Sequence, residues 1–261
     1  MRHQRLLDLV TRLRVEQPPR AVSVEKLSAD LGVSTATIRR DLQRLEADGR
    51  VVRVHGGALV ADPVQGHLED ADRRHPFAEV ARVDLADKQA VARGAAGLIA
   101  DGDTVLLDIG TTIQLVAREL AGRPITVVTA SLAVVDVLRD DERVELIVLG
   151  GMVRRAYHSL TGVLTEDNLR QLRADVAVIG ASGVRADGAV VDTTLVEVPV
   201  KRGLLTAARR SILVADQHKF PGTGTLRICR VADLDVIVTN VGADPETLAL
   251  AVAAGVEVRS V

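Results

Sequence analysis

A short segment near the middle of the chain places an acid, a glycine and two hydroxyls directly after an apolar run. The run Thr104–Leu107 is followed by Asp108, Gly110, Thr111 and Thr112. The run is typical of a buried strand, and the glycine and threonines can open a helix. Free N–H groups at a helix start bind phosphate, while a carboxylate accepts hydrogen bonds from sugar hydroxyls. The alternative is a capped helix that binds nothing.

Small and polar residues also follow other apolar runs of the chain. They are Thr129-Ala130-Ser131, Gly150-Gly151, the segment from Gly180 to Gly183, and Asp216 with Lys219. Parallel strands end at one edge of a sheet, so we expect these residues to lie along one rim. Lys88 and Arg82 precede the first of these strands and can add positive charge. The set predicts a site for a small polyhydroxylated anion.

The chain has six histidines and one cysteine, and their spacing matches no metal site. We therefore expect no metal and no cofactor. Cys229 has no histidine or base pattern beside it, which favours a structural role. No group is predicted to be catalytic.

The elements that must position the rim are predicted from residue 85 onward, where strand and helix patterns alternate. The expected strands are Thr104–Asp108, Ile125–Thr129, Val144–Leu149, Asp175–Gly180, Ser211–Asp216, Asp235–Thr239 and Val256–Val258. The expected helices are Lys88–Ala100, Thr112–Ala121, Ala130–Arg139, Val198–Arg210 and Glu246–Ala254. Continuous Val, Ile and Leu runs indicate parallel strands covered on both faces. The pattern predicts a doubly wound, mostly parallel α/β domain.

The first 60 residues have a different organisation. Apolar residues at helical spacing predict a helix around Leu6–Leu13, which Pro18 and Pro19 end. Ser23 can cap a second helix, Val24–Leu31, and Ser34 a third that runs to about Asp48. Two β-prone runs then flank His55-Gly56-Gly57 and predict a hairpin. This order of elements is that of a winged helix-turn-helix.

The third helix separates an apolar face from a polar one. Ile38, Leu42 and Leu45 fall on the face that must pack inward. Arginine can bond a guanine edge and glutamine an adenine edge, while hydroxyls at a helix start bond phosphates. The alternative is an ordinary amphipathic helix with a solvated basic face. The residues expected to contact DNA, on this helix and in the hairpin, are Ser34, Thr35, Ala36, Thr37, Arg39, Arg40, Gln43, Arg44, Arg53 and His55.

Length and composition support two domains. The chain has 261 residues, of which 47% are hydrophobic and 26% charged. Residues 1–60 hold 11 basic and 7 acidic residues, whereas the remainder holds 22 basic and 28 acidic ones. A basic head on an acidic body suggests a nucleic-acid reader joined to another module. We expect a DNA-binding domain at 1–60, a linker at 61–85 and an α/β effector-sensing and oligomerisation domain at 86–261.

Several classes of function are disfavoured. Aromatic residues make up 1% of the chain, too few for single-strand binding by base stacking. No apolar run approaches the ~20 residues of a membrane helix. The N-terminal charges are scattered, unlike those of a secretory signal, so we expect a cytoplasmic protein without membrane partners.

The motif residues resemble the DeoR family of bacterial transcriptional regulators. The resemblance rests on Thr37-Ile38-Arg39-Arg40-Asp41-Leu42 and on the hairpin sequence His55-Gly56-Gly57-Ala58. It implies an N-terminal winged helix that binds double-stranded operator DNA. The stretch from Gln17 to Ala21, with its two prolines, looks like a small insertion relative to the family.

The second half is similar to the sensor domain of the same family. The landmarks are Lys88, Asp108, Gly110, Thr111, Thr112, Gly150, Gly151, Gly162, Glu197, Lys201, Ala215, Asp216, Lys219 and Phe220. The resemblance implies a phosphorylated sugar or polyol effector and a fold shared with ribose-5-phosphate isomerase and CoA-transferase-like domains. Ala130, Pro199 and Asn240 depart from the family pattern. Glu197 and Lys201 would belong to the site only through this resemblance, because a Glu four residues before a Lys is also a common surface pair.

Three functions follow from these patterns. The first is a ligand-responsive repressor of carbohydrate-metabolism genes that acts as a homodimer or homotetramer, because one winged helix contacts few base pairs. The second is a sugar-phosphate isomerase with an appended DNA-binding head, in which Asp108, Glu197 and Lys219 would act as acid and base. The third keeps DNA binding and makes the body an oligomerisation scaffold. We expect the first, with no enzymatic activity.

Overall fold

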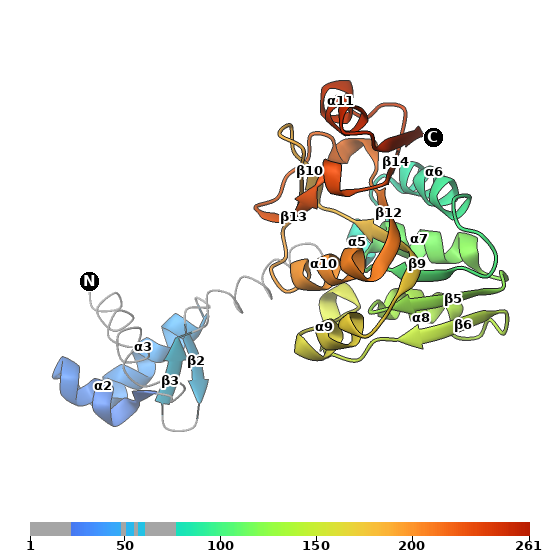
Figure 1. The fold of residues 1–261 in the computed structure, drawn as a ribbon. Helices are drawn as coiled ribbons and strands as arrows, with labels where there is room; N and C mark the ends of the chain where they lie inside the picture. The colour runs from blue at the N-terminus through green and yellow to red at the C-terminus, as the bar shows by residue number, and fades with distance from the viewer. Residues whose placement is uncertain (1–21, 48–50, 55–56, 61–76) are drawn as a thin grey trace. The chain divides into compact units, whose positions relative to one another are not determined.

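The computed structural model describes residues 22–47, 51–54, 57–60 and 77–261, with side chains for 23–43 and 77–261. The chain divides into two compact units, Met1–Ala71 and Asp72–Val261. Figure 1 traces both units along the chain. The helix expected around residues 6–13 lies outside the described residues, as do His55 and most of the expected linker.

The first unit contains the two predicted helices and the predicted hairpin. The elements are α2 (Val24–Leu31), α3 (Thr35–Ala47), β1 (Val22–Ser23), β2 (Val51–Val54) and β3 (Gly57–Val60). Ser23 caps α2 by accepting a hydrogen bond from the N–H of Lys26 at 3.2 Å. Gly32 ends that helix with φ 64°, a left-handed conformation that glycine adopts without strain. β1 is an addition to the prediction, because it pairs with β3 and extends the hairpin to three antiparallel strands.

The second unit is built on the predicted parallel sheet. Its strands are β4 (Thr104–Leu107), β5 (Ile125–Thr129), β6 (Val144–Val148), β9 (Ala174–Gly180), β12 (Ala208–Val214), β14 (Val236–Thr239) and β15 (Glu257–Ser260). Their order is β15-β14-β12-β9-β4-β5-β6, and every neighbouring pair is parallel. The prediction of a doubly wound, mostly parallel α/β domain is confirmed.

Helices cover both faces of this sheet, as Figure 1 shows. They are α5 (Phe77–Val80), α6 (Leu85–Ala96), α7 (Thr111–Leu120), α8 (Leu132–Leu138), α9 (Val163–Arg170), α10 (Val198–Ala207) and α11 (Pro245–Ala253). Alternate strand residues enter two separate cores. Val105 and Leu107 pack with residues of α6, α7 and α8, whereas Leu106 packs with residues of α9, α10 and α11. This alternation follows from the two-residue period of a strand.

Two small antiparallel elements complete the unit and were not predicted. β7 (Met152–Arg154) and β8 (Ser159–Thr161) form a hairpin, with the 3₁₀ turn η1 (Arg155–Tyr157) between them. β10 (Gly183–Val184), β11 (Ala189–Asp192) and β13 (Leu226–Arg230) form a three-stranded sheet. β7, β8 and β10 have only two or three residues, too few to show a period, and charged residues interrupt the apolar pattern of β13.

The structure differs from the expected elements in several places. The helix expected at Val198–Arg210 ends at Ala207, because β12 begins at Ala208 and pairs there with β9. Helix α9 was not expected. The end of the expected linker is helical, since α5 and the start of α6 fall within residues 77–85 and Phe77 is buried. Among the described residues, no helix is both long and apolar enough to cross a membrane.

The packing of α3 leads to a first prediction. Leu42 is 1% exposed and shares the core of the first unit with Leu27 and Ile38. We expect Leu42→Ala to cost ~2–5 kcal/mol, because it removes buried methyl groups and leaves a cavity. Thermal unfolding of the full chain should then show an earlier transition for the first unit and an unchanged one for the second. A single unchanged melting curve would contradict the assignment of Leu42 to this core.

Candidate functional site

The centre of the rim is a buried ion pair at the point where the strand order reverses. The chain runs from β4 outward through β5 and β6, and then returns to place β9 on the other side of β4. Asp108 follows β4, and its Oδ2 accepts a hydrogen bond from the N–H of Gly180 at 3.0 Å, at the end of β9. Lys201 on α10 donates to the same Oδ2 and to the Gly180 carbonyl at 3.1 Å. Ligands of doubly wound sheets bind at such a reversal.

Both charged groups of this pair are removed from solvent. The side chain of Lys201 is 4% exposed and that of Asp108 is 0% exposed. Burial alone would lower the pKa of Lys201, but the carboxylates of Asp108 and Asp192 outweigh it and hold the pKa above its ordinary value. The Asp192 carboxylate lies 3.6 Å from the Lys201 ammonium. Lys201 therefore stays charged at neutral pH.

One oxygen of the central carboxylate is left without a partner. Asp108 Oδ1 is buried and accepts no hydrogen bond from the described residues. A buried acceptor of this kind is costly unless a donor reaches it. A bound hydroxyl group would supply that donor.

The start of α7 lies directly after Asp108. Gly110 precedes the helix with φ 120°, a backbone region that favours glycine, and it supplies no capping side chain. The first N–H groups of the helix therefore have no intrahelical partner. Thr111 is buried and Thr112 is half-buried beside them. This arrangement can bind an anion next to the free oxygen of Asp108.

Helix α10 brings two of the expected residues to the site, but not as a surface pair. Lys201 N–H donates to the Glu197 carbonyl at 2.9 Å, so the helix is regular despite Pro199 in its first turn. Both side chains are buried, and each has a partner elsewhere: Lys201 pairs with Asp108 and Glu197 pairs with Arg154. The alternative of a solvated Glu–Lys pair is thus wrong.

Sequence reasoning missed three residues of this cluster. They are Arg154 on β7, Tyr157 in η1 and Asp192 at the end of β11. The Arg154 guanidinium pairs with Glu197 and lies 5.3 Å from the centre of the Tyr157 ring. Nothing in their spacing indicated the site, because they come from small antiparallel elements that the pattern did not predict.

The rim beyond β4 contains the other expected small residues. Ser131 is buried and caps α8, where its Oγ accepts the N–H of Val134 at 3.3 Å. The Gly150 carbonyl accepts a hydrogen bond from the Thr165 hydroxyl at 2.7 Å. Gly151 has no room for a side chain, because a Cβ there would lie 2.9 Å from the Thr161 carbonyl oxygen. These residues shape the backbone around the site.

Lys88, Asp216 and Lys219 form a second cluster beside β12 and β14. The ammonium of Lys88 donates to the carbonyls of Val80 and Val83, both at 2.7 Å. Burial holds the pKa of Lys88 below its ordinary value, although the nearby Asp216 opposes this effect. Asp216 is itself buried and accepts the N–H of His218 at 3.1 Å. Lys88 is thus already bonded to the turn that follows α5.

Two departures from the family pattern have a structural explanation. Asn240 accepts the N–H of Gln217 at 3.1 Å and donates to the Asp87 carbonyl at 3.1 Å. An ionised aspartate could not make the second bond, because it has no donor. Ala130 is buried in the core next to Ser131, a position that suits a small apolar side chain.

The expected DNA-contacting face of α3 is open to solvent. Ile38 and Leu42 are buried on the opposite side. Ala36, Arg39, Arg40 and Gln43 are exposed, and Thr35 and Thr37 are half-buried. Ser34 begins the helix, with its Oγ 2.9 Å from the Thr37 hydroxyl and accepting the Thr37 N–H at 3.3 Å. The side chains of Arg44 and Arg53 lie outside the described residues.

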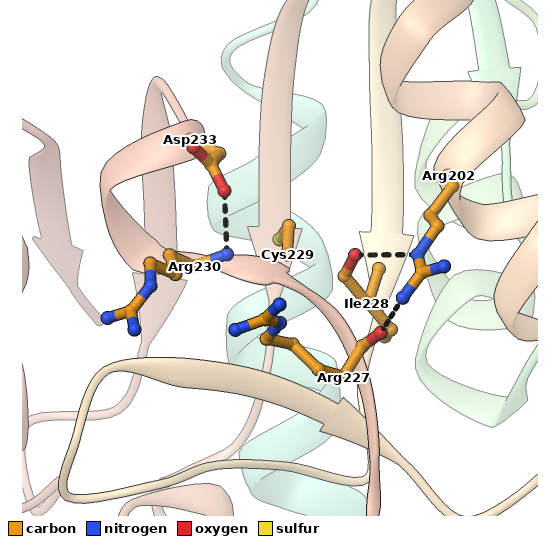
Figure 2. Close-up of a pocket in the computed structure, with 6 residues that line it drawn as sticks. All are labelled: Arg202, Arg227, Ile228, Cys229, Arg230 and Asp233. Atoms are coloured by element: carbon orange, nitrogen blue, oxygen red, sulfur yellow. Dashed lines mark hydrogen bonds between the residues drawn. The ribbon is translucent and has the colours of Figure 1, made fainter.

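A cavity of about 390 Å³ is lined by Arg202, Arg227, Ile228, Cys229, Arg230 and Asp233 (Figure 2). Arg202 closes one wall by donating to the carbonyls of Ile228, at 3.1 Å, and Arg227. Burial raises the pKa of the Cys229 thiol in this cavity to about 12, so the thiol is protonated and unreactive at neutral pH. Among the described residues, no group of three or more His, Cys, Asp and Glu side chains is arranged to hold a metal ion.

Comparison with known proteins supports a two-part regulator. Residues 2–64 match the DeoR-like helix-turn-helix domain, and residues 84–241 match the DeoR C-terminal sensor domain. The glycerol-3-phosphate regulon repressor of Haemophilus influenzae is 33% identical over 92% of this chain and 89% of its own. The transcriptional repressor AccR of Agrobacterium fabrum is 34% identical over 90% of this chain and 88% of its own.

A solved structure of ribose 5-phosphate isomerase A from Methanocaldococcus jannaschii also resembles part of the chain. It has a TM-score of 0.38 and 18% identity, and the match covers 51% of this chain and 52% of that one.

These matches define a class of protein in which a DNA-binding head is joined to a sensor domain. The chain belongs to the DeoR family of transcriptional regulators. It is a regulator of transcription rather than an enzyme, so the isomerase alternative is set aside.

The environment of Tyr157 leads to a second prediction. Burial raises the pKa of this phenol, although the nearby Lys201 opposes the rise. Tyr157 is the sole tyrosine of the chain. We expect its absorbance at 295 nm to titrate above pH 10 in the native protein and near pH 10 in denaturant. Because the unfolded chain loses this proton first, stability should fall as the pH rises above about 10. Identical titrations in both states would contradict the buried position.

Proposed function

We propose that this protein is a sequence-specific repressor of carbohydrate-metabolism genes controlled by a phosphorylated sugar or polyol. In this proposal, residues 1–60 bind operator DNA, 61–85 connect the two domains, and 86–261 sense the effector and form the oligomer. The observation that carries the sensor role is the buried Asp108 carboxylate with one unpartnered oxygen, next to the open start of α7. Relatives named as repressors of a glycerol-3-phosphate regulon support the sugar-phosphate class.

The proposed effector would span two parts of the rim. Its phosphate would bind the N–H groups and hydroxyls of Thr111 and Thr112, where the helix dipole favours an anion. Its hydroxyls would donate to Asp108 Oδ1 and to the carboxylate of Glu197. Burial raises the pKa of Asp108, and Lys201 opposes this rise and would orient the carboxylate. The remaining rim residues of the proposed site are Lys88, Gly110, Ser131, Gly150, Gly151, Gly180, Asp216 and Lys219.

The proposed DNA contact uses the exposed face of α3. Arg40 and Gln43 lie on that face and can reach base edges, while Ser34 and Thr35 at the helix start suit phosphate contacts. Operator binding by such a short helix needs two heads on repeated half-sites. We therefore propose a homodimer or homotetramer.

An exposed apolar surface on the second unit supports self-association. Ile147, Val148, Met152, Val153, Val163 and Leu164 are each more than 40% exposed. They lie on β6, β7 and α9, and β6 is an edge strand of the large sheet. Contiguous apolar surface and an unpaired strand edge are features that monomers normally avoid.

The proposal is tested by titrating the full chain against labelled duplexes from upstream of its own and neighbouring genes. Fluorescence anisotropy at near-physiological salt would measure affinity, with scrambled duplexes as the control. Glycerol 3-phosphate, fructose 6-phosphate and galactosamine 6-phosphate would then be added to each complex. We expect one of them to change specific binding 5- to 150-fold and to leave scrambled binding unchanged. Equal affinity for specific and scrambled DNA would overturn the repressor role.

The third prediction concerns base readout. We expect Arg40→Ala to weaken specific DNA binding by ~1–3 kcal/mol and to relax the base preference at one position of each half-site, because a bidentate contact to a base is lost. Arg139→Ala provides a matched control, since Arg139 is an exposed arginine of the second unit. Unchanged affinity in Arg40→Ala would exclude Arg40 from the readout.

The fourth prediction concerns the effector. We expect Asp108→Asn to keep operator affinity and to abolish the response to the active sugar phosphate, because the amide offers one acceptor oxygen in place of two and removes the negative charge nearest to Lys201. Wild-type protein should gain ~2.7 kcal/mol of stability with ligand at ~100 times its dissociation constant, and the variant should gain none. Asp141→Asn is the control, because Asp141 accepts the N–H groups of Gly122 and Arg143 in the turn before β6, at the amino ends of the strands and not at the rim. A full response in Asp108→Asn would make the site assignment wrong.

A further inference from the structure

Most of the aromatic side chains of this protein meet at one place. The chain has two phenylalanines, one tyrosine and no tryptophan. The rings of Phe77 and Tyr157 pack edge to face, with centroids 5.7 Å apart and an interplanar angle of 84°. His158 stacks on Phe77 with centroids 5.1 Å apart and an angle of 13°. In a protein so poor in aromatic residues, this cluster identifies a specific contact between two distant segments.

Phe77 is the first described residue of the second unit. It is the first residue of α5, and residues 61–76 join it in sequence to the DNA-binding part. The other end of α5 and its following turn are held by Lys88, through the carbonyls of Val80 and Val83. Phe77 is 5% exposed, so its ring is anchored in the sensor unit. The entry segment is thus attached at both of its ends.

Tyr157 connects this entry segment to the ion pairs of the candidate site. Its ring also lies 5.3 Å from the guanidinium carbon of Arg154. Arg154 pairs with Glu197 at the start of α10, and Lys201 of the same helix pairs with Asp108. Side-chain contacts thus run from Phe77 to Glu197, and the backbone of α10 joins Glu197 to Lys201, whose N–H donates to the Glu197 carbonyl at 2.9 Å.

The turn that carries Tyr157 is also bonded to the rim. The carbonyl of His158 accepts the N–H of Leu132 at 2.8 Å, and the N–H of Leu160 donates to the Ala130 carbonyl at 2.8 Å. Ser131 lies between these two bonded residues and is one of the proposed effector residues. A shift of the rim loop therefore moves the turn with it.

We propose that Tyr157, which contacts both Arg154 and Phe77, transmits effector binding to the chain segment that leads to the DNA-binding head. The inference rests on the proposed function. An effector that donates a hydrogen bond to Glu197 competes with Arg154 for that carboxylate, whereas its bond to Asp108 Oδ1 leaves Lys201 on Oδ2. The Arg154 guanidinium then changes its position over the Tyr157 ring, and Phe77 follows because the two rings pack edge to face. Phe77 and Tyr157 are positioning residues, since they act through α5.

The test separates coupling from binding in the full-length protein. Phe77→Leu keeps an apolar side chain in the buried position but removes the ring contacts. We expect it to bind the operator duplex, and the sugar phosphate active on the wild type, within about twofold of the wild-type affinities. The change in DNA affinity caused by that sugar phosphate should fall from 5- to 150-fold to less than about twofold. Glu79→Ala is the matched control, because Glu79 is exposed on the same helix, and it should respond as the wild type does.

A second readout needs no effector. Tyr157 is the single tyrosine and there is no tryptophan, so intrinsic emission near 303 nm reports on this residue alone. Because coupling is reciprocal, operator binding should change that emission in the wild type and in Glu79→Ala. It should leave the emission of Phe77→Leu unchanged, after correction for absorption by the duplex. Tyr157→Phe keeps the ring contacts and should retain coupling, while its lack of signal confirms the source of the emission.

The outcomes distinguish this inference from the proposed function. Specific DNA binding without a change of Tyr157 emission in the wild type would overturn the inference and leave the repressor role intact. Full coupling in Phe77→Leu would overturn it as well, and so would a loss of sugar-phosphate binding in that variant, since the residue would then belong to the binding site. Absence of specific DNA binding by the wild type would overturn both.

Discussion

The pairing of Lys201 with Asp108 joins parts of the chain that are more than 90 residues apart. Asp108 ends the strand from which the sheet grows in both directions, and Lys201 approaches it from the helix that covers one face. The Gly180 N–H and carbonyl complete the contact from the neighbouring strand. An ion pair this deep loses much of its Coulombic energy to desolvation, so it is a poor source of stability. Its role is instead to orient the Asp108 carboxylate, whose other oxygen is left without a partner at the rim.

The polar groups around this pair share the same constraint. Each buried charge has an opposite charge or a backbone group beside it: Glu197 has Arg154, and Lys88 has two carbonyls. Such pairs cost a great deal to break when only one partner is removed, because the other charge is then buried alone. An effector that competes for one of these partners must therefore rearrange its neighbours. This is the physical basis on which a small ligand can displace Tyr157 and the segment that begins at Phe77.

In the first unit, helix α3 has one buried face and one exposed face. α3 packs on α2 through apolar residues at helical spacing on one side, which leaves its polar face open to solvent. Ile38 and Leu42 are buried, while Arg39 and Arg40 are exposed. The match to the DeoR-like helix-turn-helix domain assigns DNA binding to this unit. The exposed residues of α3 are those that the helical period predicts to be exposed. The strand β1 adds a third member to the hairpin, which only pairing with β3 could reveal.

The sequence alone determined the elements whose patterns are long and local. Most of the seven parallel strands appear as Val, Ile and Leu runs, the exception being β15 with its charged Glu257 and Arg259. Ser23 and Gly32 mark the ends of α2, the first through its side chain and the second through its left-handed backbone. Asp108 with Gly110, Thr111 and Thr112 was recognisable because strand, turn and helix start are adjacent in sequence. Only the tertiary structure decided the partners of Glu197 and Lys201, the position of Tyr157 and the contact with Phe77. Those contacts involve short antiparallel segments, and they join residues that are 43 to 93 positions apart in the sequence. Neither a short segment nor a contact over such a separation produces a periodic pattern of residue types. The choice of partner for a buried charge is made by the fold, since it depends on which strands and helices lie side by side.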